Sequence, residues 1–186
     1  VNLACIYYLD KNPEGFGTLV MSYWMQSVLL GLFNFVNMLS VKKVEPGSLT
    51  MNNKPVTESK ASKGCAALFF LVHYNAFHLA YLVFIIVTYF MSIDFKYLML
   101  ASGGFALSLL IEFIQNRSEG NNTPANMGKM MFLPYVRIIP MHLVILAPQF
   151  LNITAPMLFL WLKTFADVIM YLFSRKAVTT HPYRQF

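Results

Sequence analysis

The sequence predicts an all-α fold, a bundle of membrane-spanning helices, and the composition and the length of the apolar runs carry this prediction. Of the 186 residues, 57% are hydrophobic and 12% are charged, and that charged share is about half the share in soluble domains. Several apolar runs reach the length of about 20 residues that crosses a bilayer. A membrane β-barrel is excluded because its strands are roughly ten-residue alternating segments, whereas these runs are long and continuous.

Five apolar segments have spanning length, and Pro, Gly, Asn and charged residues separate them. An apolar stub at residues 1–9 precedes them; it is too short to span and is either the end of a sixth span or an interfacial piece. The five expected helices cover residues 18–41, 65–91, 95–114, 132–151 and 155–173. We therefore predict one transmembrane helical domain over residues 1–186.

The connections between these helices differ in length. Residues 92–94 and 152–154 form very tight turns, so the helices on either side of each turn are expected to pack as antiparallel hairpins. Residues 42–64 and 115–131 are longer, polar and rich in Asn, Ser, Gly and Lys. We expect these two connections to be solvated loops.

The positions of the basic residues predict the orientation, because cytoplasmic loops are enriched in Lys and Arg. Ten of the 14 lie in the two long loops and in the tail after residue 173. The remaining four are Lys11 and Lys96 on the opposite side and Arg137 and Lys163 within spans. Both long loops and the C-terminus are therefore predicted to be cytoplasmic. The net charge of +6 is read as a membrane-surface charge, so the expected partner is the lipid bilayer and nucleic acid is not expected.

Polar side chains within the predicted spans gather in the cytoplasmic half of the bundle. Ionisable groups in hydrocarbon cost a few kcal/mol each and usually face the interior. At about 1.5 Å per residue, Asn34, His73, His142, Lys163 and Asp167 lie roughly 10 to 16 Å from the cytoplasmic ends of their helices. We expect these five residues to line a polar site that binds a metal, a cofactor or a small polar ligand.

The most specific interpretation of this polar site is a metal centre. The imidazoles of His73 and His142 with the carboxylate of Asp167 would form a first shell for zinc or non-haem iron, and a haem clamped by the two histidines is a less favoured alternative. Shared ligation requires imidazole nitrogens roughly 3 to 4 Å apart. It also requires an inward-facing His73, which three- and four-residue steps place on one helix face with Phe70 and Phe77.

Simpler interpretations of the same residues remain open. Lys163 and Asp167 are four residues apart and can neutralise one another as a buried ion pair. Either His73 or His142 can make an interhelical hydrogen bond instead of binding a metal. His73 and His78 cannot both point at one site, because a five-residue step turns about 140° around a helix.

Four stretches of the chain together resemble an uncharacterised family of bacterial multi-pass membrane proteins. They are SYWMQSVLLGLFNFVNML, FFLVHYNAF, PYVRIIPMHLVIL and WLKTFADVIMYL. The matching motif residues are Tyr23, Trp24, Gly31 to Asn34, His73, Tyr74, Phe77, Arg137, His142, Lys163 and Asp167. The chain departs from the pattern at Gln26, where an acid is expected, and at Asn75, where glycine is expected. The resemblance implies a bacterial inner membrane and names no reaction.

Two functional hypotheses follow, and no enzyme motif of recognised spacing decides between them. In the first, the polar site of His73, His142, Asp167 and Lys163 binds a transition metal, a cofactor or a small polar ligand. In the second, the polar residues only hold helices together, and the chain is a non-catalytic accessory or structural subunit of a larger membrane protein complex.

Overall fold

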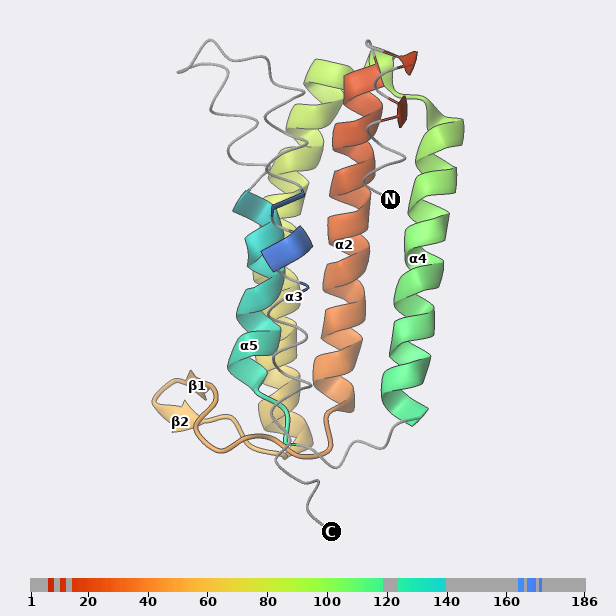
Figure 1. The fold of residues 1–186 in the computed structure, drawn as a ribbon. Helices are drawn as coiled ribbons and strands as arrows, with labels where there is room; N and C mark the ends of the chain where they lie inside the picture. Colours follow the sequence, from red (N-terminus) through yellow and green to blue (C-terminus); the bar gives the residue numbers. More distant parts are fainter. Residues whose placement is uncertain are drawn as a thin grey trace. The chain divides into compact units, whose positions relative to one another are not determined.

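The computed structural model describes residues 7–8, 11–12, 15–118, 124–139, 164–165, 167–169 and 171, without the side chains of residues 116–118 and 137. It divides into two units, Val1–Pro134 and Tyr135–Phe186. In the first unit, the helices are α2 (Phe16–Ser40), α3 (Lys60–Tyr89), α4 (Phe95–Ser118) and α5 (Met127–Phe132). A 3₁₀ turn, η2 (Phe90–Ser92), follows α3, and another, η3 (Leu133–Arg137), follows α5. Figure 1 shows this arrangement.

Three helices are long and apolar enough to cross a membrane: Phe16–Ser40, Lys60–Ser92 and Phe95–Gln115. They correspond to the first three of the five predicted spans. The short helix α5 lies just before the fourth predicted span, and it begins at Met127 because the side chain of Asn126 caps it by accepting from the Lys129 amide at 2.9 Å. In the second unit, residues 138–139, 164–165, 167–169 and 171 are helical. The rest of the last two predicted spans lies outside the described residues, as does the stub apart from Tyr7 and Tyr8.

A side-chain cap also moves the start of α3. The Ser59 hydroxyl accepts from the amide of Ser62 at 3.2 Å, so the helix begins at Lys60 and includes five residues that we expected in the loop. In its first turn, the buried Lys63 donates from Nζ to the carbonyl of Val41, just after α2. The cationic side chain of α3 thereby satisfies a carbonyl at the C-terminal end of α2, where a positive charge is favourable.

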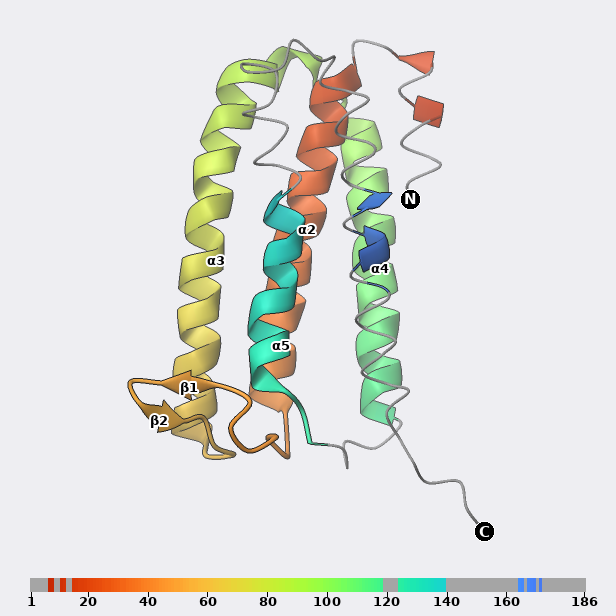
Figure 2. The same cartoon turned by 60° about the vertical axis from the view of Figure 1, so that its left-hand side comes forward.

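The helix α2 lies between α3 and α4 and makes most of the interhelical contacts of the first unit (Figures 1 and 2). The prediction that the helices flanking residues 92–94 pack directly on one another is therefore wrong. The reason is the path of the turn. The Thr18 hydroxyl donates to the carbonyl of Ser92 at 3.0 Å and accepts from the amide of Asp94 at 2.8 Å. The turn thus crosses the start of α2, so α3 and α4 lie on opposite sides of α2.

The first long loop is partly folded. Strands β1 (Thr50–Met51) and β2 (Lys54–Pro55) pair in an antiparallel hairpin. Asn52 and Asn53 at its tip have φ values of 50° and 59°, in the left-handed region that two-residue hairpin turns require and that Asn tolerates. The predicted loop over residues 42–64 therefore contains a short hairpin, which the sequence analysis did not predict.

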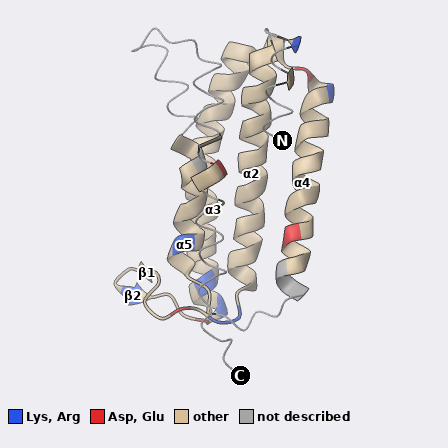
Figure 3. Ribbon diagram, in the orientation of Figure 1, with Lys and Arg blue, Asp and Glu red and all other residues tan. Residues whose placement is uncertain are grey.

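The two long loops meet at one end of the bundle. Val44 and Ala125 form a parallel bridge, in which the amide of Ala125 donates to the carbonyl of Lys43 at 2.9 Å and the amide of Glu45 donates to the carbonyl of Ala125 at 3.0 Å. The expectation that both loops share one end is confirmed. Figure 3 shows basic residues gathered at this end, which we call the loop end (residues 41–59 and 124–126).

Candidate functional site

The helices α2 and α3 pack closely around Tyr74. Its ring is fully buried, and its hydroxyl lies 2.8 Å from the Ser27 hydroxyl and 3.2 Å from the Ser27 carbonyl. Gly31 makes room for the ring, since a Cβ there would lie 2.5 Å from Tyr74 Cε1. A small residue and a hydrogen-bonded Tyr thus bring the two helices together, the usual way in which helices associate in lipid.

His78 is the histidine of α3 that faces α2. It is 1% exposed, and its Nδ1 lies 2.9 Å from the carbonyl of Tyr74, so Nδ1 is the donor of that bond. Trp24 of α2 donates from its indole nitrogen to the carbonyl of His78 at 2.8 Å. Within the part of the chain that the structure describes, His78 Nε2 has no hydrogen-bond partner.

His73, the predicted metal ligand, lies on a different side of α3. Its side chain is exposed, and its ring stacks on Phe69 at 5.4 Å and meets Phe77 edge-on at 5.2 Å. Phe70, by contrast, is fully buried and stacks on Tyr74 at 5.1 Å. The expectation that Phe70, His73 and Phe77 share one inward face is therefore wrong, because depth along a helix does not fix rotation about its axis.

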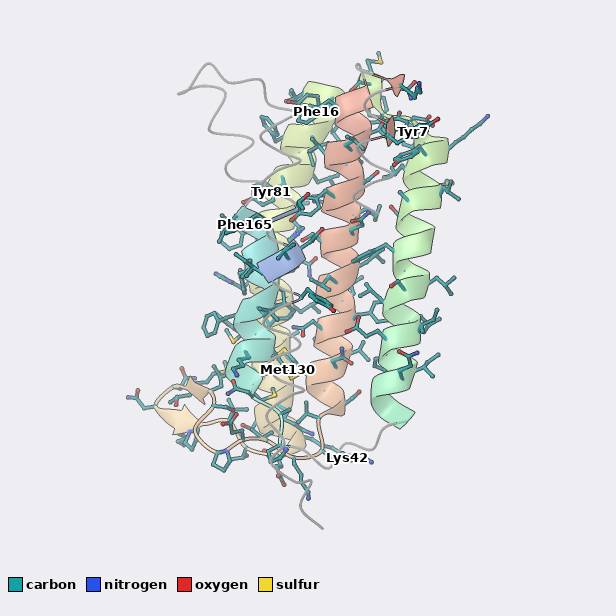
Figure 4. All side chains as sticks on the ribbon, in the orientation of Figure 1. Tyr7, Phe16, Lys42, Tyr81, Met130 and Phe165 are labelled. Carbon is teal, nitrogen blue, oxygen red and sulfur yellow. The ribbon has the colours of Figure 1, made fainter. Side chains whose placement is uncertain are left out.

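Asn34 connects two helices of the first unit. Its side-chain amide donates to the carbonyl of Met130 in α5 at 2.8 Å, and Met130 is labelled in Figure 4. The same amide lies 3.7 Å from the sulfur of Met38 one turn along α2. Asn34 thus fastens the loop-end half of α2 to α5.

The other predicted site residues belong to the second unit. Asp167 is helical and half-buried, whereas His142 and Lys163 lie outside the described residues, as does the side chain of Arg137. The shared site of His73 and His142 and the Lys163–Asp167 pair therefore stay predictions. Among the described residues alone, no three His, Cys, Asp or Glu side chains gather closely enough to hold a metal ion.

Polar groups that the sequence analysis did not single out as a site lie on α2 and α4. Ser22, Gln26 and Ser102 each carry buried side-chain atoms that lack a hydrogen-bond partner in the described part of the chain. A sequence signal exists, since Ser22 and Gln26 are four residues apart and so fall on one face of an otherwise apolar helix. Its partner on α4 could not be chosen without the order of the helices.

Comparison with known proteins identifies a family for this chain. No curated protein and no solved structure matches the chain. A model of a protein family of unknown function, DUF6498, matches residues 2–182, which is nearly the whole chain. The family agrees with the resemblance to uncharacterised proteins noted from the sequence. The chain belongs to DUF6498, a family of unknown function.

Proposed function

We propose that this chain is a multi-pass protein of a bacterial inner membrane and acts there as a non-catalytic accessory or structural subunit of a larger membrane protein complex. The observation that carries the proposal is the use of polar side chains within the apolar helices. Ser27 bonds with Tyr74, Trp24 with the carbonyl of His78, and Asn34 with the carbonyl of Met130. These groups hold helices together, so their role is structural. In a reaction site, by contrast, such side chains would be available to a substrate.

The loop end supports the same proposal. Its two loops are joined by backbone hydrogen bonds and by the side chain of Asn126, which donates to Glu45 Oε2 at 2.7 Å. Exposed basic residues surround this junction: Lys42, Lys43, Lys54, Lys60 and Lys129. A folded loop surface of fixed shape is what a protein partner needs, whereas an unstructured connection would lose conformational entropy on binding.

Topology is tested first, by labelling single cysteines in intact cells. In a background with Cys5 and Cys65 replaced by Ser, Lys54→Cys reports on the loop end and Lys11→Cys on the opposite end; both native side chains are exposed. A membrane-impermeant maleimide should modify Lys11→Cys from outside and reach Lys54→Cys only after lysis. The reverse pattern would contradict the cytoplasmic assignment of the loops.

The subunit role is tested by the size of the particle in native membranes solubilised in mild detergent. The chain should migrate in a complex of fixed stoichiometry larger than itself, and Glu45→Ala with Asn126→Ala should weaken that complex while leaving membrane insertion intact. Glu112→Ala, which alters an exposed acid on α4, is the matched control. A chain that migrates alone in every preparation would refute the subunit role.

A second candidate function is the binding of a transition metal or haem. The predicted polar site of His73, His142, Asp167 and Lys163 would bind it. It is favoured by one observation, the exposure of His73 between Phe69 and Phe77, which leaves the imidazole accessible. Elemental analysis and a haem absorption spectrum of purified protein test it. A stoichiometric metal or haem that is lost in His73→Gln, and retained in the control Asn75→Gln, would favour this site over the subunit role.

A further inference from the structure

One face of α2 carries Ser22, Gln26 and Phe33, and this face meets α4. Steps of four and seven residues return to nearly the same side of a helix with 3.6 residues per turn. Phe33 packs edge-on against Phe113 of α4, with ring centroids 6.2 Å apart and an interplanar angle of 74°. Ser22 and Gln26 therefore point toward α4 as Phe33 does.

Ser102 lies on the facing side of α4. It precedes Phe113 by eleven residues, which is about three turns, so both residues share one face of that helix. Two contacts fix the register of α2 and α4, which run in the same direction (Figure 1). The sequence separation is 76 at the Thr18–Asp94 hydrogen bond and 80 at the Phe33–Phe113 contact. Ser102 is thus level with the stretch from Ser22 to Gln26.

These three residues form what we call the α2–α4 polar cluster (Ser22, Gln26 and Ser102). Ser22 and Gln26 are each 1% exposed. Their side-chain atoms Ser22 Oγ, Gln26 Oε1 and Gln26 Nε2, and also Ser102 Oγ, are buried without a hydrogen-bond partner among the described residues. In an apolar environment such groups are costly to leave unpaired, and proteins satisfy them with ordered water.

We propose that the α2–α4 polar cluster binds water inside the bundle. The Gln26 amide offers an acceptor and two donors, and each Ser hydroxyl both donates and accepts. All three side chains are uncharged, so they suit a neutral molecule that donates and accepts at once, and water is the smallest such molecule. A bound water typically makes about three hydrogen bonds, which two hydroxyls and one amide can supply. This site is independent of the subunit role proposed above.

Solid-state NMR of the full-length protein in liposomes tests the site. With ¹⁵N-labelled Gln, magnetisation transferred from water protons should appear on the Gln26 side-chain amide as it does on exposed Gln115, which serves as the positive control. Loss of one signal in Gln26→Leu assigns Gln26, and Gln26→Asn replaces that variant if it does not accumulate. Absence of water transfer to Gln26, with transfer to Gln115 intact, would overturn the proposal.

A second variant separates bound water from general hydration of the helix. Ser22→Ala with Ser102→Ala removes both hydroxyls with little change of volume and should lower the transfer to Gln26 several-fold, while the Gln115 signal stays unchanged. Ser48→Ala, which removes a hydroxyl at the loop end, is the matched control and should leave the Gln26 signal as it is. An unchanged Gln26 signal in the double variant would show that the three residues do not share a water site.

Discussion

The two sides of α2 are built differently, and the difference separates a tight helix contact from a loose one. Toward α3, Gly17 and Gly31 leave space for Tyr89 and Tyr74, and the hydroxyl of Tyr74 bonds directly to Ser27. Toward α4, the contacts include a Thr18 hydrogen bond at one end and the Phe33–Phe113 pair toward the other. In an apolar stretch of 18 residues, 28% of α3 is buried, compared with 11% of α4. The helix α4 is therefore held by much less contact.

This contrast agrees with how helices associate in lipid. Lipid tails are as apolar as Leu side chains, so exclusion of apolar surface from water does not drive helices together there; close packing over small residues and direct hydrogen bonds do. The α2–α3 interface has both features. The α2–α4 interface has polar side chains, on Ser22, Gln26 and Ser102, that lack hydrogen-bond partners in the described part of the chain, which leaves α4 dependent on fewer contacts.

The largest expected effect is at Gly31. In Gly31→Ala, the new methyl would lie 2.5 Å from Tyr74 Cε1 and 2.7 Å from Cδ1, and Tyr74 cannot move aside without breaking its bond to Ser27. We expect a loss of about 1–3 kcal/mol of stability from overpacking, measured by thermal unfolding in detergent. Gly64→Ala in α3, where a Cβ would meet nothing within 4 Å, is the control and should be neutral or stabilising by about 0.5–1 kcal/mol. Equal effects at the two positions would contradict the close contact.

Removal of the Tyr74 hydroxyl should have the next largest effect. Tyr74→Phe keeps the ring over Gly31 and loses the two contacts with Ser27, at an expected cost of about 1 kcal/mol, typical of interhelical hydrogen bonds in membranes. A double-mutant cycle with Ser27→Ala measures the coupling. If the two single changes simply add, the hydrogen bond contributes nothing to the α2–α3 interface.

At the α2–α4 interface we expect a smaller loss. Phe113→Leu removes the edge-on contact with Phe33, and aromatic pairs contribute about 0.5–1.5 kcal/mol beyond their buried area; the low burial of α4 favours the lower end. The same unfolding measurement applies, with Phe132→Leu, an exposed ring at the end of α5, as control. A loss larger than that of Tyr74→Phe would reverse the ranking of the two interfaces.

The smallest effect concerns the loop end, outside both interfaces. Glu45→Ala removes the acceptor of the exposed bond from Asn126, and exposed contacts of this kind contribute about 0.5 kcal/mol or less. Global stability should hardly change, but hydrogen exchange at the amides of Glu45 and Ala125 should quicken because their bridge loses a side-chain support. Unchanged exchange would show that the backbone bonds alone hold the loops together.

The apolar runs were sufficient to predict the three long helices, because length and composition decide whether a segment can cross a bilayer. Alternation of helix direction was sufficient to predict that both long loops lie at one end. The position of α2 between α3 and α4 was not predictable from the short turn, since it depends on hydrogen bonds from Thr18, a residue 74 positions before Ser92.

The candidate site illustrates a second limit. Depth along the helix identified His73, but rotation turns His78 toward α2 and leaves His73 exposed. The rotation is set by which face packs, and Gly31 opposite Tyr74 decides that. Two local signals, in contrast, were present in the sequence and were missed. They are the hairpin turn at Asn52 and Asn53 and the cap at Ser59.

The bridge between Val44 and Ala125 can form only late in the synthesis of the chain. Glu45 and Asn126 are 81 residues apart, so the ribosome must add α3, α4 and the second loop before the first loop finds its partner. Until then the carbonyl of Lys43 and the amide of Glu45 lack the hydrogen bonds that they later make to Ala125. Closure of the loop end is therefore a late step of biogenesis, and a nascent chain that stops before Ala125 has three long helices but an open end.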